Sequence, residues 1–295
     1  MKFFKTTLIM ALLCAGWLAC VTSLGMAEEA QKPAESQEAL KGYDDWHVLL
    51  NPYGWLFGLQ GDVTGQGKSA SVSLTLDDTL KLIDEIELIF GGRLEWSKGP
   101  WGFLFDGVFV QMEDEGERRR DIQIPVLVRP TIPLRGHISV IGEISIVEAA
   151  LSYDVYTSSH LVDNMPDLIL EALAGPRYTF LRTKAHLSIQ GPRRILTLDA
   201  DKTRDWVDPF VGGRVQWRPA PNWILGFRTD VGGFTLSSDV AVNLNAEVAY
   251  RINRWLLINA GYRALYTDYE TGSGKDKFAF NMWIHGPWTG VVLEF

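Results

Sequence analysis

From Trp46 to Phe295 the chain alternates apolar and polar residues in segments that Gly, Pro, Asn and Asp interrupt. A period of two puts successive side chains on opposite faces of a β-strand, so this pattern predicts strands. No segment is a continuous apolar run long enough to cross a bilayer as a helix. We expect ten strands, near residues 46–62, 84–97, 101–112, 138–154, 167–189, 206–218, 223–235, 239–251, 255–269 and 277–295.

The positions of the tryptophans indicate which solvent surrounds these strands. A transmembrane strand needs about 9–11 residues with apolar side chains outward and polar ones inward, but a soluble sandwich alternates too. Tryptophan rings suit the headgroup level of a membrane, because part of the ring is apolar and part is polar. Five of them flank short turns: Trp96, Trp101, Trp217, Trp223 and Trp255. The combination predicts an all-β fold, a closed antiparallel transmembrane up-and-down β-barrel of about ten strands.

The links between the strands separate by length. Turns 98–100, 219–222 and 252–254 are short and fall on one side, whereas links 63–83, 113–137, 190–205 and 270–276 fall on the other. Outer-membrane barrels have short periplasmic turns and longer outer loops, so the separation fits. Residues 155–166 are long for a periplasmic turn, and an error there changes the strand count to eight or twelve.

Two outer links have features of their own. Leu76, Leu80 and Ile83 recur at helical spacing, which predicts a short helix over Asp77–Ile83. The charge cluster Glu113–Arg120 predicts a solvated loop tip, and a lipopolysaccharide contact through its arginines is the alternative.

The first 27 residues predict a signal peptide, with Lys2 and Lys5 before an apolar stretch and small residues before a cut after Ala27. A lipoprotein acylated on Cys20 is the alternative. Residues 28–45 are polar and predict a flexible periplasmic segment, which leaves residues 46–295 for the barrel.

The composition of the mature chain limits the covalent bonds, partners and cofactors that can be expected for it. Both cysteines, Cys14 and Cys20, precede the expected cut, so no disulfide, thiolate nucleophile or cysteine-ligated metal is expected. Removal of two lysines leaves a net charge of 26 − 36 = −10, which argues against nucleic acid as a partner. Nucleotide-binding and metal-binding motifs such as the P-loop, HExxH and the EF-hand are absent from the sequence, so no cofactor is expected.

Alternation also assigns charged residues to the inside of the barrel. The expected ionic network comprises Glu95, Asp106, Arg177, Asp208, Arg214, Arg228, Asp230, Glu247 and Arg263; by the same parity Glu85, Glu87, Arg93, Glu148, Glu171 and Arg251 face inward. Buried charges must be paired or hydrated, and the arginine fork suits carboxylates. Either the network fills the interior and braces the wall, or unpaired groups line a narrow passive pore for small solutes. Because ten strands lie near the filled limit, bracing is favoured.

A resemblance to a known group rests on the second half of the chain. Its motifs are Trp206–Arg214 (WVDPFVGGR), Asp230–Phe234 (DVGGF), Gly261–Arg263 (GYR) and the pair Gly286 and Pro287. Together they resemble an uncharacterised group of Gram-negative outer-membrane β-barrel proteins, porin- or OmpA-like in general description. The resemblance covers residues 200–295 and brings no catalytic residue with it. Its glycines, Gly212, Gly232 and Gly261, are expected to make room for large neighbours or to permit strand coiling.

The last strand adds a second resemblance. An alternating strand that ends in an aromatic residue, here Phe295, resembles the ends of outer-membrane barrels that the barrel-assembly machinery recognises. Localisation in the bacterial outer membrane, with lipid and lipopolysaccharide as neighbours, is expected. Some such barrels are lipid-modifying enzymes for lipid A or phospholipid acyl chains. His285 is the one histidine worth testing for that alternative, although no local motif indicates a nucleophile paired with a base.

Overall fold

A computed structural model describes residues 45–65, 68–81, 86–119, 135–162, 165–190 and 195–295. Ten antiparallel strands form a closed barrel, because the first strand, β1, pairs with the last strand, β14 (Leu50 opposite Leu293 and Tyr53 opposite Gly290). This confirms the predicted fold class and strand number. The ten strands are β1 (Trp46–Trp55), β4 (Ile86–Lys98), β5 (Trp101–Arg119), β6 (Arg135–Thr157), β9 (Leu168–Gln190), β10 (Ile195–Ala220), β11 (Trp223–Gly232), β12 (Val240–Asn253), β13 (Leu256–Thr271) and β14 (Phe278–Glu294).

The predicted first strand, residues 46–62, is wrong as a single element. β1 ends at Trp55, and β2 (Gly58–Gly65) continues the pairing along β14, while its other edge pairs with β3 (Lys68–Leu74) instead of β4. The β2–β3 hairpin therefore occupies much of what was predicted as the link 63–83. A helix, α3 (Leu76–Lys81), follows and confirms the predicted helix over 77–81; Ile83 lies outside the described residues. The helix is anchored where the hydroxyl of Thr79 donates to the carbonyl of Phe57 at 2.7 Å.

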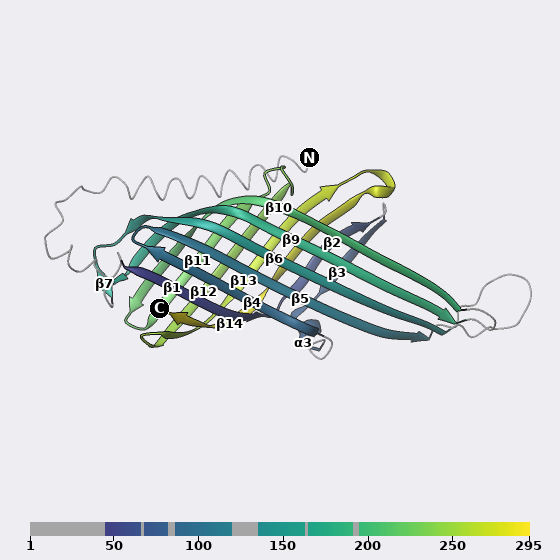
Figure 1. Cartoon of the computed structure of the whole chain (residues 1–295), viewed down its shortest axis with the longest axis horizontal. Coiled ribbons are helices and arrows are strands. Elements are labelled where there is room, and N and C mark those ends of the chain that lie inside the picture. Colours follow the sequence, from purple (N-terminus) through teal and green to yellow (C-terminus); the bar gives the residue numbers. More distant parts are fainter. Residues whose placement is uncertain (1–44, 66–67, 82–85, 120–134, 163–164, 191–194) are drawn as a thin grey trace, which may run out of the picture.

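Two strands, β5 and β10, run much further than predicted at one end of the barrel. Glu113–Arg119, predicted as a loop tip, belongs to β5 and pairs with β6, and residues 195–205, predicted as a link, belong to β10 and pair with β9. Arg120 lies outside the described residues. Backbone pairing can continue beyond a bilayer without an apolar face, which is why alternation of apolar residues underestimates these strands. Figure 1 shows β5, β6, β9 and β10 projecting beyond the rest of the barrel at its right-hand end.

The opposite end carries the short turns and Phe295, and we call it the turn end; the end with the projecting strands is the loop end (Figure 1). Turns 99–100 and 221–222 join their strands directly. The uncertain link 155–166 folds as a small separate hairpin of β7 (Leu161–Val162) and β8 (Met165–Pro166), so the count of ten barrel strands stands. At the loop end β11 and β12 are joined by residues 233–239, and a 3-10 turn, Gly274–Asp276, lies between β13 and β14.

The outer face of the barrel is apolar. Exposed Phe105, Leu151, Val211 and Ile258 come from four different strands. The five tryptophans predicted at strand ends are all exposed, from 39% for Trp96 to 60% for Trp101. Within the part of the chain that the structure describes, no helix is long and apolar enough to cross a bilayer.

Candidate functional site

A row of charged residues crosses the inner face of five neighbouring strands. The strand register places Arg93, Asp106, Glu148, Arg177 and Asp208 directly opposite one another, in this order, on β4, β5, β6, β9 and β10. Directly opposite residues lie close enough for their side chains to interact. Period two keeps each of them pointing into the barrel, and all five are at most 8% exposed.

Glu148 is the central carboxylate of this layer. One of its oxygens accepts from Arg177 Nε at 2.9 Å and from Arg263 Nη2 at 2.5 Å, and the other accepts from Arg228 Nη2 at 2.7 Å. Its side chain is fully buried. Three guanidinium groups on β9, β11 and β13 therefore meet one carboxylate on β6, so the contact joins opposite parts of the wall.

Two further carboxylates complete the layer. Asp230 accepts from Arg177 Nη2 at 2.5 Å, from Arg228 Nε at 3.1 Å and from Asn243 Nδ2 at 2.9 Å. Asp106 accepts from Arg93 Nε at 2.9 Å, Arg263 Nη1 at 3.0 Å and the hydroxyl of Tyr53 at 2.9 Å. Charge-assisted hydrogen bonds of this kind are stronger than neutral ones, and in a buried site they offset part of the cost of removing the charges from water.

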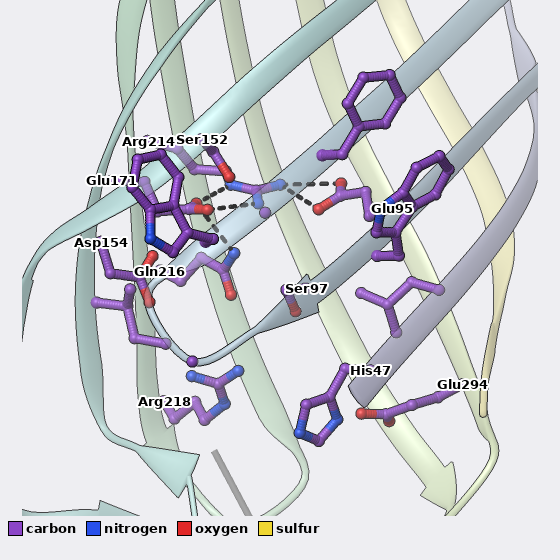
Figure 2. A pocket seen from close by; sticks show the side chains of 17 residues that line it. His47, Glu95, Ser97, Ser152, Asp154, Glu171, Arg214, Gln216, Arg218 and Glu294 are labelled. Atoms are coloured by element: carbon purple, nitrogen blue, oxygen red, sulfur yellow. Dashed lines mark hydrogen bonds and ion pairs between the residues drawn. The ribbon is translucent and has the colours of Figure 1, made fainter. Parts of the chain in front are cut away.

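Arg214 forms a second cluster on the turn side of this row. Its Nη1 donates to both oxygens of Glu95, at 2.9 and 2.7 Å, and its Nη2 donates to Glu171 Oε1 at 3.0 Å; Nε also contacts Glu171. Figure 2 shows the guanidinium of Arg214 between the two carboxylates, with Gln216 beside Glu171. Arg93 links the clusters, because its Nη1 lies 3.8 Å from Glu95 and 3.5 Å from Glu247. We call the whole set the ionic layer: Arg93, Glu95, Asp106, Glu148, Glu171, Arg177, Arg214, Arg228, Asp230, Glu247 and Arg263.

The structure places eight of the nine residues expected in the network within the ionic layer. Asp208 is also buried, but its hydrogen bonds go to Trp206 Nε1 at 3.0 Å and to the amide and hydroxyl of Ser238 at 2.8 and 2.7 Å. It therefore holds the β11–β12 link, where Phe234 has a positive φ of 50°. The parity assignment had put Arg93, Glu148 and Glu171 inside without including them in the network, although Glu148 is its centre. Arg251 faces Glu294 nearer the turn end, Glu85 lies outside the described residues, and the side chain of Glu87 is not described.

An apolar layer, which alternation did not predict, lies next to the ionic layer. Twelve buried side chains from β1, β5, β6, β10, β13, β14 and the link between β1 and β2 pack together there: Tyr53, Trp55, Phe57, Val108, Val110, Ile146, Trp206, Leu265, Phe280, Met282, Ile284 and Trp288. Along β5 the inward residues pass from Asp106 to Val108 and Val110, so this layer lies on the loop side of the charges. The guanidinium of Arg263 lies 5.3 Å from the ring of Trp55, which joins the two layers. The sequence of β14 could have indicated this layer, because apolar residues occupy both of its faces: Phe280, Met282 and Ile284 point inward and Trp283 points outward.

On the turn side the lumen is hollow. A cavity of about 80 Å³ between Glu95, Glu171, Arg214 and Arg218 is the pocket drawn in Figure 2, and a second of about 90 Å³ is lined by Asn51, Arg93, Glu247 and Asn259. Both share Arg218 and Glu294 with a mouth of about 650 Å³ at the turns. We call these three spaces the vestibule.

His285 lies on the outer face, away from the lumen. Its Nδ1 and the hydroxyl of Tyr262 are 2.7 Å apart. Among the described residues no group of three or more His, Cys, Asp or Glu side chains is arranged to hold a metal ion.

The closed ladder, the apolar exterior and the aromatic rim define an outer-membrane β-barrel protein, because a closed barrel leaves no strand edge in lipid. No family model and no curated protein matches the chain. Among solved structures, it is similar to the translocator domain of the autotransporter NalP from Neisseria meningitidis, at 12% identity and a TM-score of 0.36, with 96% of this chain and 99% of that chain covered. It is also similar to the outer membrane protease OmpT from Escherichia coli, at 10% identity and a TM-score of 0.45, with 85% and 97% covered. A third is Ail, the attachment invasion locus protein of Yersinia pestis, at 12% identity and a TM-score of 0.28, with 85% and 99% covered.

Proposed function

We propose that this protein is a structural barrel of the outer membrane whose filled lumen does not conduct solutes. The observation that carries the proposal is the apolar layer across the lumen, stacked on the ionic layer. A passive pore for ions and small polar solutes needs a continuous aqueous path, and apolar constrictions close such paths by excluding water. Ten strands also lie close to the eight at which side chains just fill a barrel.

The ionic layer supports a bracing role. Asp106, Glu148 and Asp230 each bind guanidinium groups from more than one strand, so the network ties distant parts of the wall together. Arginine suits this arrangement, because it stays charged and binds carboxylates through a planar fork. A narrow passive pore, the function that the sequence alone left open beside bracing, would need these groups to face water instead of one another.

A lipid-modifying enzyme is supported less well. Such an activity would work through His285, and within the described contacts this imidazole is hydrogen-bonded to the Tyr262 hydroxyl. A hydrogen bond between the polar ends of two side chains at the membrane interface accounts for this contact.

Planar-bilayer recording tests the sealed lumen. We expect the wild-type barrel to insert without steady conductance. The double variant Trp55→Ser, Arg263→Ser should conduct, because it removes a stacked pair that spans both layers. Conductance steps from this variant would also show that the purified protein inserts into the bilayer. Steady wild-type conductance that falls when lumen arginines are replaced would contradict the proposal and favour the pore.

A further inference from the structure

Three buried oxygen atoms in the vestibule have no hydrogen-bond partner within the described part of the chain: Asn51 Oδ1, Asn259 Oδ1 and Glu247 Oε2. Asn51 is 4% exposed and Asn259 is 6% exposed. All three residues line the cavity of about 90 Å³. Native proteins rarely leave buried acceptors unsatisfied, so a cluster of three in one cavity points to a bound donor.

Glycines on strands next to these residues leave space beside their side chains. Gly290 of β14 lies opposite Asn259, and a Cβ at Gly290 would come within 2.6 Å of Asn51 Oδ1. Gly226 of β11 lies opposite Glu247, and a Cβ there would come within 2.7 Å of Glu247 Cγ. The cavity is lined from strands β1, β4 and β10–β14.

The chemistry of the lining restricts the ligand. The three atoms are all acceptors, and the one carboxylate oxygen among them, Glu247 Oε2, also forms an ion pair with Arg93 Nη1 at 3.5 Å. Repulsion from that guanidinium is twice as large for a divalent cation as for a singly charged one, and three oxygens are too few for the six to eight ligands of calcium. A primary ammonium group instead carries three N–H donors, no acceptor and a single charge.

We propose that this cavity binds a small primary ammonium compound that enters from the turn end. Its three N–H groups would donate to Asn51, Asn259 and Glu247. Any short substituent would extend past Arg218 and Glu294 into the mouth of the vestibule, since those residues line both spaces. The inference goes beyond the structural role and is independent of whether the lumen conducts.

Saturation-transfer NMR on the full barrel in detergent tests the site with two probes. Methylammonium offers three N–H donors, whereas tetramethylammonium has the same charge and none. We expect methylammonium to bind and tetramethylammonium, at equal ionic strength, to give no signal. Equal signals from the two probes, or none from methylammonium, would overturn the proposal and leave a water-filled cavity.

Matched variants locate the binding. Glu247→Gln should weaken methylammonium binding by about tenfold or more, through loss of one charge-assisted hydrogen bond. Gly290→Ala should abolish binding without a change of charge, because the new methyl group takes the space beside Asn51. Asp154→Asn, which lies in the neighbouring cavity, should bind like wild type. Heat-modified gel mobility checks that each variant folds, and unchanged binding in folded Glu247→Gln would refute the site.

Discussion

At the scale of single residues, the barrel depends on how fully its buried charges are satisfied. Glu148 binds three guanidinium groups and Asp230 binds two, so removal of one arginine strands more than one acid. Breaking a buried ion pair by removing one partner typically destabilises a protein by about 3–5 kcal/mol. Exposed pairs contribute far less, because water screens them.

Replacement of Arg177 tests this bracing. Arg177→Met keeps the volume of the side chain but leaves Glu148 and Asp230 each without one donor. We expect a loss of about 3 kcal/mol or more in the free energy of unfolding, measured by urea titration in lipid vesicles. Lys202→Ala, at an exposed position, serves as the control and should change stability by less than about 0.5 kcal/mol. An Arg177→Met barrel as stable as the control would refute the bracing role.

Inward glycines are the second determinant at this scale. A Cβ at Gly212 would come within 2.2 Å of the carbonyl of Thr229 and 2.4 Å of Asp230 Cβ. A Cβ at Gly232 would meet the carbonyl of Pro209 at 2.7 Å and Phe210 Cβ at 3.0 Å, and one at Gly261 would meet the carbonyl of Ala246 at 2.3 Å and the ring of Trp288 at 2.7 Å. The expectation of room for a large neighbour fits Gly261 beside Trp288, whereas at Gly212 and Gly232 the nearest atoms are the backbone carbonyls of Thr229 and Pro209.

Gly212→Ala is expected to destabilise the barrel by about 1–3 kcal/mol, the usual cost of forcing extra volume into a packed interior. Gly107 provides the matched control, since it belongs to the same kind of strand and a Cβ there would meet nothing within 4 Å. Unfolding midpoints of the two alanine variants check the difference. If Gly107→Ala proved the more damaging, the packing account would be wrong.

At the scale of elements, alternation predicts strands well where one face meets lipid and the other meets charge. The barrel segments of β11, β12 and β13 follow this pattern, and their positions agree with the sequence to within a few residues. The pattern fails where the environment changes. Glu113–Arg119 has no apolar face, because only backbone pairing with β6 extends β5 there. β1 and β2 were predicted as one strand, because both pair antiparallel with β14 and so run in the same direction.

The residues of the ionic layer were likewise predictable from the sequence only in part. Parity alone assigns Arg93, Glu148 and Arg177 to the lumen, because each lies on a regular strand. Parity does not say which acid meets which arginine, since partners such as Glu148 and Arg228 are 80 residues apart in the chain. It also missed the apolar layer, because inward apolar residues such as Met282 resemble lipid-facing ones in sequence.

At the scale of the whole molecule, the barrel is open toward one end and filled toward the other. The vestibule leads from the turns to Arg214, and the apolar layer lies beyond the charges. Chemical labelling can test this difference between the two ends, because the only two cysteines of the chain, Cys14 and Cys20, precede residues 46–295 in the sequence. Introduced cysteines should therefore report on their own surroundings.

Gln216→Cys, in the vestibule, should react with a small water-soluble thiol reagent added to the purified barrel in detergent. Met282→Cys, in the apolar layer and 2% exposed in the native protein as methionine, should stay unlabelled until the barrel is unfolded. Mass spectrometry of the intact chain measures both. Comparable labelling of the two positions in the folded state would show that water reaches through the lumen.

The stacked layers also bear on the permeability of the cell envelope. An open porin adds leakage with every copy, so its abundance trades nutrient uptake against entry of toxic compounds. A barrel blocked along its axis carries no such penalty. If the lumen is sealed as we propose, a high copy number of this protein would leave the barrier of the outer membrane to small toxins intact.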